Sequence, residues 1–224
     1  RKALGIIGSA GAAAVAAACG GASPTSPSST ARSSTSSTTT GPTGTTNSTA
    51  CVVSPEETIG PYPDITGMVN NPAFNRRDVT EGKAGTPLTL SLKVVNVKAG
   101  CAAVLNAAVE IWQCDAHAIY HHPDGGDEAQ RDPAFQGYGQ TRTDAAGAFH
   151  FRTIKPVPYP GRTAHIHVRI QSDRAGSLAT QLYLPNEAGN ERDMIYRHLT
   201  SAERALVALL LKPMGPWYVR PAML

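Results

Sequence analysis

The stretch that decides the fold is PLTLSLKVVNV, residues Pro87–Val97, in which apolar and polar side chains alternate. Leu88, Leu90 and Leu92 fall on one face of an extended chain, and the residues between them fall on the other. A period of two over this length is typical of a β-strand with one buried face. The segment therefore predicts a strand that packs against a second layer.

Short runs of the same kind recur further along the chain. They predict strands, separated by turn signals, at Ala107–Cys114, Gly139–Thr143, Ala148–Ile154, His165–Ile170 and Leu178–Leu184. The sequence DAAG at Asp144–Gly147 is predicted to be the turn of a hairpin between the second and third of these strands. Regular spacing of short strands favours an antiparallel β-sandwich. The fold class expected for residues 51–224 is therefore mainly β, with long loops that carry a candidate active site.

One stretch near the C-terminus has two interpretations. Ser201–Leu211 predicts a helix, with Thr200 or Ser201 as its cap. A strand through Leu206–Leu211 fits the same residues nearly as well. The sequence leaves this choice open.

The composition of the 224 residues excludes several classes of protein. A formal net charge of +3 and a charged fraction of 17% are too small for the basic footprint of a nucleic-acid-binding protein, so no nucleic-acid partner is expected. Four cysteines are too few for a disulfide-dense miniprotein. The 21 glycines and 17 prolines favour turns over long helices.

The first 50 residues differ in composition from the rest. Residues 1–19 begin with Arg1-Lys2, continue as an apolar run and end at Cys19, which is the pattern of a secretory signal or of a lipoprotein segment whose cysteine carries lipid. A buried apolar helix is the alternative. Residues 20–50 are mainly Ser, Thr, Pro, Gly and Ala, which bury too little apolar surface to fold, and they predict a disordered tether. The pattern predicts an exported bacterial protein, secreted or held at the cell surface.

Export would place Cys51, Cys101 and Cys114 in an oxidising compartment, where disulfides persist. One disulfide and one odd thiol is the simplest arrangement, and the sequence leaves the pairing open. The absence of a C-x-x-C spacing disfavours a thiolate metal site.

The candidate chemistry begins with His165 and His167. In a strand, alternate side chains share a face, so the two imidazoles are presented side by side, which suits a single metal ion. An ordinary pair of strand histidines is the alternative interpretation.

Two tyrosines strengthen the case for a site. Tyr159 lies six residues before His165 in a proline-rich segment that also holds Arg162, and Tyr120 follows a predicted strand. The prolines restrict the backbone around Tyr159. Each tyrosine alone is typical of a half-buried packing residue. Together with the two histidines, they indicate a built site.

Beyond these side chains, the sequence resembles the intradiol ring-cleavage dioxygenases over nearly all of residues 51–199, and within that family it is similar to the exported single-chain members. The pieces that carry the resemblance are PEETIGPY (Pro55–Tyr62), RRDV (Arg76–Val79), VEIWQCDA (Val109–Ala116), Tyr120, TDAAGAF (Thr143–Phe149), FRTIKP (Phe151–Pro156), Tyr159, Arg162 and AHIH (Ala164–His167). Their number, order and spacing leave little room for chance agreement.

The resemblance implies one non-haem Fe(III) per chain, held by two tyrosinates and two histidines, which are here Tyr120, Tyr159, His165 and His167. A free phenol has a pKa of ~10, so a phenolate at neutral pH needs a strong cation such as ferric iron beside it. No carboxylate stands next to the histidine pair, which disfavours the two-histidine, one-carboxylate site of Fe(II) oxygenases.

The resemblance also implies the reaction. The expected substrate is a catechol-type ortho-dihydroxyaromatic, which reacts with O2 and opens between its hydroxyl-bearing carbons to a cis,cis-muconate-type diacid. Arg162 is expected to stabilise negative charge on the substrate, and Tyr159 to leave the metal and help to remove a substrate proton. The substrate pocket is expected to include Ile59, Gly60, Pro61, Tyr62 and Gln181. A homodimer is compatible with the resemblance, and the sequence leaves the ring substituents open.

Two further expectations concern the surroundings of the site. Val157 stands where the family often has a glycine, so the valine would be strained if that position needs a positive φ. His117, His121 and His122 flank Tyr120 and are expected to be solvated loop histidines rather than ligands.

Two rival functions remain at this point. An exported β-sandwich binding module without a catalytic metal would also have this fold. A zinc hydrolase built on His165 and His167 would need a third histidine or a carboxylate, which no sensible spacing supplies.

Overall fold

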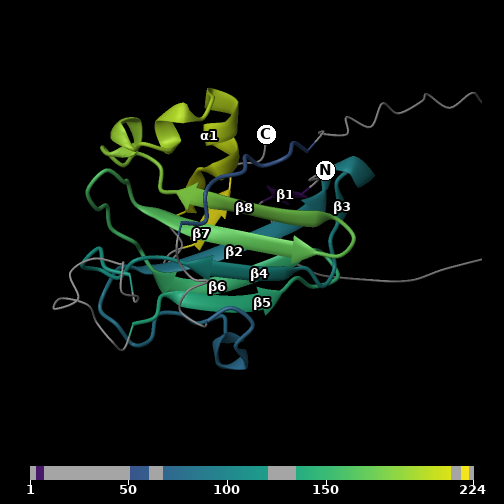
Figure 1. Ribbon diagram of the computed structural model, residues 1–224, viewed down its shortest axis with the longest axis horizontal. Coiled ribbons are helices and arrows are strands. Elements are labelled where there is room, and N and C mark those ends of the chain that lie inside the picture. Colours follow the sequence, from purple (N-terminus) through teal and green to yellow (C-terminus); the bar gives the residue numbers. More distant parts are fainter. Residues whose placement is uncertain (1–3, 8–50, 61–67, 121–134, 213–217, 222–224) are drawn as a thin grey trace, which may run out of the picture. The chain divides into compact units, whose positions relative to one another are not determined.

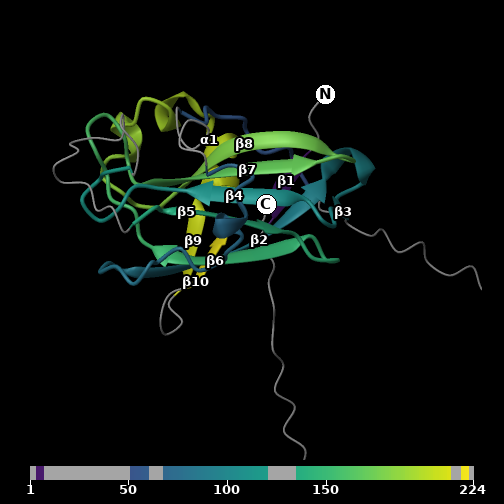
Figure 2. The same ribbon diagram turned by 60° about the horizontal axis from the view of Figure 1, so that its bottom comes forward.

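The computed structural model describes residues 4–7, 51–60, 68–120, 135–212 and 218–221, which form two β-sheets packed face to face (Figures 1 and 2). The first sheet contains β1 (Leu4–Ile7), β2 (Pro87–Asn96), β3 (Ala102–Ala103), β6 (Ala148–Ile154), β9 (Leu209–Lys212) and β10 (Tyr218–Pro221). The second contains β4 (Ala108–Trp112), β5 (Tyr138–Arg142), β7 (His165–Ser172) and β8 (Gly176–Tyr183). The helical segments are short: η2 (Pro72–Phe74), η3 (Val97–Ala99), η4 (Asn190–Arg192), η5 (Tyr196–His198) and α1 (Ser201–Val207).

The strand pairing confirms the predicted β-sandwich. In the first sheet, β6 lies along one edge of β2, while β1 and β10 share its other edge. In the second sheet, the order is β5-β4-β7-β8. All of these pairs are antiparallel except β10 with β2, which is parallel.

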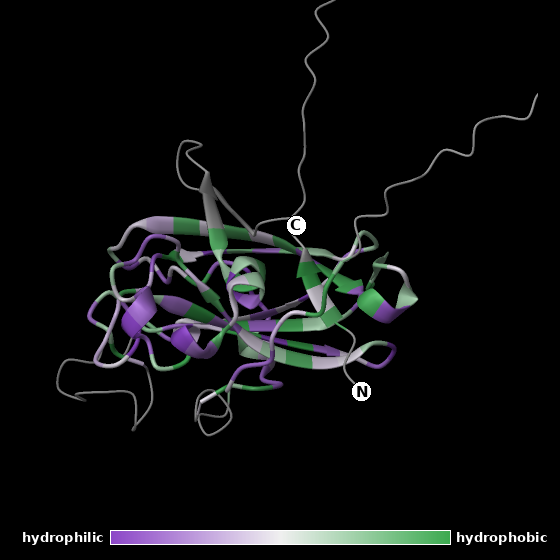
Figure 3. Ribbon diagram, turned by 90° about the horizontal axis from the view of Figure 1, so that it is seen from above, coloured by the Kyte–Doolittle hydropathy of each residue, from purple (hydrophilic) through white to green (hydrophobic). Residues whose placement is uncertain are grey.

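The core forms between the sheets because the strands alternate as the sequence predicts. Leu88, Leu90 and Leu92 of β2 are buried in one cluster with Ile166 and Val168 of β7. Figure 3 shows hydrophobic and hydrophilic residues interspersed along the strands. Because Ile166 and Val168 face the core, the residues of β7 that alternate with them lie on the outer face of the second sheet.

The predicted hairpin at Asp144–Gly147 is wrong in its pairing. The turn itself is present, since Gly147, at φ 72°, donates its N–H to Asp144 O at 2.9 Å. However, β5 pairs with β4 and β6 pairs with β2, so the turn carries the chain from one sheet to the other. Phe149 and Phe151 are buried with the core residues of β2, and this long-range burial selects a strand partner that the local turn does not encode.

At the C-terminus, each of the two interpretations holds in part. The helix α1 begins after Thr200, whose hydroxyl accepts from Glu203 N, while the Glu203 carboxylate accepts from Thr200 N. This reciprocal pair is a capping box. The helix ends at Val207, and strand β9 follows.

Strand β1 uses residues that the sequence pattern assigned to an export segment. Leu4 and Ile6 are buried in the core, and β1 pairs with Lys93–Asn96 of β2. The rest of residues 1–19 and the predicted tether lie outside the described residues. Among the described residues, no helix has the length and apolar character needed to cross a bilayer.

One disulfide joins Cys51 to Cys101, and Cys114 is a buried free thiol. The predicted arrangement of one disulfide and one odd thiol is therefore confirmed. The bond ties the start of the 51–60 segment to the turn that follows η3.

Glu57 anchors the 51–60 segment to β8. Its N–H donates to Ala179 O at 2.9 Å, and its carboxylate accepts from the hydroxyls of Tyr183 and Thr180. Burial raises the pKa of Glu57 to about 7, and the hydrogen bond from Tyr183 opposes this shift only in part. The position of this segment, which carries two of the predicted pocket residues, thus depends on a buried carboxyl group.

Breaking the Cys51–Cys101 disulfide is predicted to lower the free energy of unfolding by about 2–4 kcal/mol, because the bond restrains a long loop in the unfolded chain. Thermal unfolding with and without a thiol reductant measures this effect. A Cys51→Ser, Cys101→Ser double variant should match the reduced wild type and be insensitive to reductant. Equal stability of oxidised and reduced wild type would contradict the prediction.

Replacing Glu57 by Gln is predicted to remove a loss of stability at higher pH. The raised pKa means that between about pH 4.5 and 7 the folded protein keeps a proton that the unfolded chain has released. The contribution of Glu57 to stability therefore falls as pH rises through this window, by up to about 3 kcal/mol. Denaturant unfolding at about pH 5 and about pH 8 should show the variant gaining on the wild type at the higher pH.

The control for this experiment is Glu191→Gln, since the Glu191 side chain is 74% exposed. It should follow the wild type at both pH values. A stability difference between Glu57→Gln and wild type that does not change with pH would refute the role of the buried carboxyl group.

Candidate metal centre

The two predicted histidines lie at the start of β7, on the outer face of the second sheet. On the neighbouring strand β8, Tyr183 lies opposite His165, and Gln181 lies opposite His167. On the other side, Trp112 of β4 pairs with His167, and their rings stack at 5.0 Å with an angle of 6°. Figure 1 shows that β7 begins and β8 ends at the same end of the sandwich, where long loops gather.

The four predicted ligands converge at this end. The Nε2 atoms of His165 and His167 are 3.2 Å apart, and the Tyr159 hydroxyl lies 3.4 Å from His165 Nε2. The Tyr120 ring is 6.0 Å from the Tyr159 ring and 6.4 Å from the His167 ring. Tyr120 and both histidines are buried, and Tyr159 is partly buried. The structure therefore brings together the side chains that the sequence analysis assigned to one metal ion.

The orientation of His165 is set by the backbone before it. His165 Nδ1 lies 2.7 Å from Thr163 O, and because a carbonyl oxygen only accepts, Nδ1 carries the proton. In the neutral ring, the lone pair on Nε2 then faces His167 and Tyr159. His167 Nδ1 is buried and has no hydrogen-bond partner among the described residues.

Tyr159 is presented by a tight turn of four residues, Tyr159–Arg162. The backbone N–H groups of Tyr159 and Arg162 each donate to the carbonyl of the other, at 3.1 and 2.9 Å. Pro160 occupies the second position and Gly161, at φ 79°, the third, as a type II turn requires. The sequence YPGR thus places a phenol and a guanidinium side by side.

Tyr120 is presented by a second tight loop after β4. The Asp115 carboxylate accepts from the backbone N–H groups of His117 and Ile119, and Asp115 N donates to Ile119 O. Ala118 has a positive φ of 68° within this loop. The loop turns the chain so that Ile119 and Tyr120 are buried while His117 is exposed.

Burial keeps the four groups uncharged. Burial raises the pKa of Tyr120 well above its usual value, and it also raises the pKa of Tyr159, although the charge of Arg162 opposes that rise. Burial and the charge of Arg162 lower the pKa of His165 to about 4. Burial and the neighbouring His165 lower the pKa of His167 well below its usual value. At neutral pH these are two phenols and two neutral imidazoles, and the Nε2 lone pair of His165 faces His167 and Tyr159.

Arg162 is held by a network that joins distant parts of the chain. Its Nε–H donates to Asp193 at 3.0 Å, and its Nη2 donates to the Gln181 side-chain oxygen. Gln181 is fully buried and donates to Thr58 O at 3.0 Å. Gln181 therefore links Arg162 to the 51–60 segment, because its side chain is hydrogen-bonded to both Arg162 and Thr58.

This donor set fits ferric iron. Two phenol oxygens that can ionise and two imidazole nitrogens would neutralise most of a 3+ charge, as tyrosinate ligands do for ferric haem. Among the described residues, no group of three or more His, Cys, Asp or Glu side chains could hold a metal. The third histidine or carboxylate that a catalytic zinc site would need is therefore missing from this part of the chain.

The predicted pocket residues are placed only in part. Ile59 packs against the cluster that contains Tyr120 and Trp112, and Gly60 follows at φ 66°. Pro61 and Tyr62 lie outside the described residues. Lining of the substrate by Ile59, Gly60 and Gln181 stays a prediction.

The expectations for the neighbouring residues have mixed outcomes. The condition for strain at Val157 is not met, since Val157 does not have a positive φ, and it packs against the same cluster as Ile59. The exposed side chain of His117 is confirmed. His121 and His122 lie outside the described residues.

The sequence analysis missed Asp193, Glu57 and Trp112 as supports of the site. Asp193 and Glu57 are buried carboxylates, but each lies in a polar loop segment whose local pattern indicates exposure. Only the partners that the fold brings to them reveal their role. The position of Trp112 could have been predicted, because the alternation of side chains along β4 places it on the outer face of the sheet.

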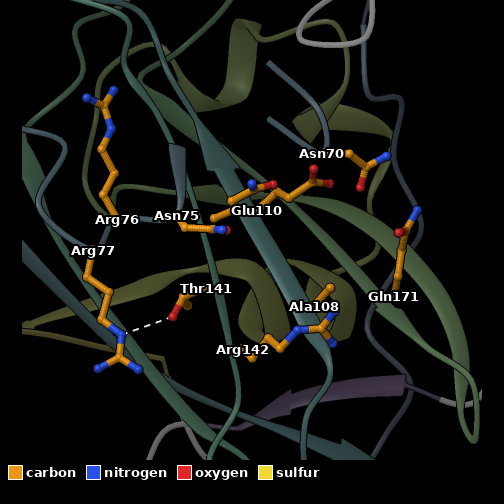
Figure 4. Close-up of a pocket in the computed structure, with 10 residues that line it drawn as sticks. Asn70, Asn75, Arg76, Arg77, Ala108, Glu110, Thr141, Arg142 and Gln171 are labelled. Carbon is orange, nitrogen blue, oxygen red and sulfur yellow. Dashed lines mark hydrogen bonds between the residues drawn. The ribbon is translucent and has the colours of Figure 1, made fainter. Parts of the chain in front are cut away.

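A separate cavity on the same sheet face is lined by other residues. Figure 4 shows this cavity of about 710 Å³, lined by polar and charged side chains that include Glu110, Arg77 and Arg142. None of the four predicted ligands lines it. Glu110 is already paired with Arg169 and accepts from the Tyr138 hydroxyl, so it is not free to act as a metal ligand.

Comparison with known proteins places this geometry in a family. The sequence model described as "Dioxygenase" matches residues 60–213. The protocatechuate 3,4-dioxygenase beta chain of Burkholderia cepacia is 36% identical over 132 residues, which is 54% of this chain and 56% of that protein. The chain spans about half the length of the curated relatives it matches.

Solved structures agree with this assignment. The dioxygenase domain of a dioxygenase and carbohydrate-binding protein fusion from Streptomyces sp. SirexAA-E is similar with a TM-score of 0.52 and 29% identity, covering 73% of this chain and 90% of that one. An intradiol ring-cleavage dioxygenase from Tetranychus urticae has the same fold, with a TM-score of 0.59, 24% identity and coverage of 73% and 87%. Since the family model covers more than half of the chain, and the fold and the four converging side chains agree with it, this protein belongs to the intradiol ring-cleavage dioxygenase family.

Proposed function

We propose that this protein is an Fe(III)-dependent intradiol dioxygenase that cleaves a catechol-type ortho-dihydroxyaromatic with O2. The observation that carries the proposal is the convergence of two phenols with two imidazoles whose Nε2 atoms are 3.2 Å apart. Tyr120, Tyr159, His165 and His167 would hold the iron. When bound, ferric iron supplies Lewis acidity, which lets the phenols ionise and draws electron density from the substrate.

The protein's own groups would orient the substrate and move its protons. Tyr159 is more exposed than Tyr120 and lies on a turn beside Arg162, so its Oη is assigned to accept a proton from a substrate hydroxyl. Tyr120 is more deeply buried and is assigned to remain a fixed ligand. The Arg162 guanidinium would stabilise negative charge on the substrate.

The overall reaction balances without a further reductant. The diol and one O2 give a cis,cis-muconate-type diacid that contains both oxygen atoms. Catechol, protocatechuate and hydroxyquinol are the substrates to compare first, since the described residues do not select among ring substituents.

Loss of a ligand is predicted to remove both colour and activity. Iron-loaded wild type should show a visible charge-transfer band from tyrosinate to Fe(III) and consume one O2 per diol. His167→Ala should bind iron poorly, and Tyr159→Phe should shift the band. Both variants should lose more than about 100-fold in kcat/KM, since even residues that only support a ligand are worth about 10–100-fold. Visible spectra, iron analysis and an oxygen electrode provide the measurements.

The matched control is His117→Ala, which removes an exposed histidine close in sequence to Tyr120. It should keep the band and the turnover of wild type. Full activity in His167→Ala would contradict the assignment of His167 as a metal ligand. A colourless protein that takes up zinc in preference to iron would instead favour a hydrolase, and one that takes up no metal would favour a binding module.

We also propose that the protein is exported, through residues 1–19, and tethered by residues 20–50, with Cys19 as a candidate lipid attachment site. The Cys51–Cys101 disulfide supports an oxidising location. If Cys19 is lipidated, the exported protein should incorporate labelled fatty acid and Cys19→Ala should not. N-terminal sequencing of the exported form would show whether Leu4–Ile7 is retained.

A further inference from the structure

Asp193 is a buried carboxylate between η4 and η5, far in sequence from the predicted ligands. It is 1% exposed and accepts four hydrogen bonds. Its Oδ1 accepts from the backbone N–H groups of Ile195 and Tyr196, at 2.8 and 2.9 Å, and so closes a local turn. Its Oδ2 points to a different part of the chain. The two oxygens therefore have separable tasks.

Oδ2 holds two consecutive residues that lead into β7. Arg162 Nε lies 3.0 Å from it, and Thr163 N lies 2.7 Å from it. Thr163 is also the residue whose carbonyl oxygen accepts from His165 Nδ1. One carboxylate oxygen is thus bonded directly to the cation of the site and, through a single residue, linked to the orientation of a candidate metal ligand.

The contact with Arg162 determines which part of the guanidinium is left for the site. A guanidinium has five N–H donors in a fixed plane. Asp193 takes the Nε–H and Gln181 takes one Nη2–H. Nη1 has no hydrogen-bond partner among the described residues. A carboxylate on the Nε edge therefore fixes the plane in which the remaining donors can reach a substrate anion.

We propose that Asp193 is a positioning residue of this enzyme, which holds the Arg162 guanidinium in its working plane and holds His165 as the Nδ1–H tautomer through Thr163. This inference rests on the proposed function. Asp193 forms no hydrogen bond to the four candidate ligands, and the proposed positioning runs through Arg162 and Thr163.

The isosteric variant Asp193→Asn removes one of the two acceptor oxygens. The asparagine oxygen can keep the place of Oδ1 and the turn at Ile195 and Tyr196. Its NH2 group then faces the donors of Arg162 and Thr163, which cannot bond to it. The matched control is Asn190→Ala. Asn190 lies in the same segment and accepts from the Thr163 hydroxyl at 2.7 Å, but it has no contact with Arg162.

The first measurement uses iron-free protein and is independent of activity. Nitrogen NMR of the imidazoles should show His165 as a single Nδ1–H tautomer in wild type and in Asn190→Ala, and as a mixture in Asp193→Asn. A wild-type tautomer in Asp193→Asn would overturn the link from Asp193 to His165. Circular dichroism checks that each variant is folded. Asp193→Ser, which keeps a short acceptor for the turn and removes the charge, replaces the asparagine variant if that one does not fold.

The second measurement is kcat/KM of the iron-loaded proteins. Asp193→Asn should lose about 10–100-fold, the range for residues that orient a metal site, and Asn190→Ala should lose less than about threefold. In an Arg162→Gln background, the loss from Asp193→Asn should be at least about threefold smaller, because part of it acts through Arg162. Equal losses in Asp193→Asn and Asn190→Ala, or losses that multiply fully, would overturn the proposal.

The proposed function and the positioning role of Asp193 can be refuted separately. An iron-loaded wild type that oxidises no catechol contradicts the proposed function, whatever the tautomer of His165. An active wild type beside an equally active Asp193→Asn contradicts only the positioning role.

Discussion

The alternation of side chains along β7 is the constraint on which the rest of the site depends. Ile166 and Val168 must face the other sheet to close the core, so His165 and His167 must face outwards together. A shift of one residue in register would bury the imidazoles in the core and expose the aliphatic residues, at a large cost in free energy. The same burial that stabilises the sandwich therefore fixes the geometry of the candidate metal centre.

Neighbouring strands complete the support for this pair of histidines. Trp112 stacks on His167 from one side, and Gln181 approaches from the other. The turn at Tyr159–Arg162 and the loop before Tyr120 then need only place two phenols above a rigid sheet. Sites built on strands in this way are more sharply positioned than sites built on loops alone.

The four candidate ligands are uncharged in the absence of a metal ion. Burial keeps the phenols protonated and the imidazoles neutral, so without a cation the site has little net charge of its own. Arg162, a permanent cation beside the site, is balanced by Asp193, whose pKa is lowered by the backbone N–H groups around it despite the opposing effect of burial. A bound ferric ion would bring positive charge to this site and favour loss of the phenol protons.

The sequence by itself predicted the strands β2, β4, β5, β6, β7 and β8 and the sandwich class, and its resemblance to a family implied the four candidate ligands. Period-two alternation in PLTLSLKVVNV and in HIHVRI is a local property, and so is the turn encoded by YPGR. Only the tertiary structure decided the partner of β6, the pairing of Cys51 with Cys101 and the burial of Asp193 and Glu57. The physical reason is that these features depend on surfaces brought together from distant parts of the chain. A polar loop residue such as Asp193 is buried only because the fold places hydrogen-bond donors from distant segments around it. The local sequence pattern contains no information about those donors.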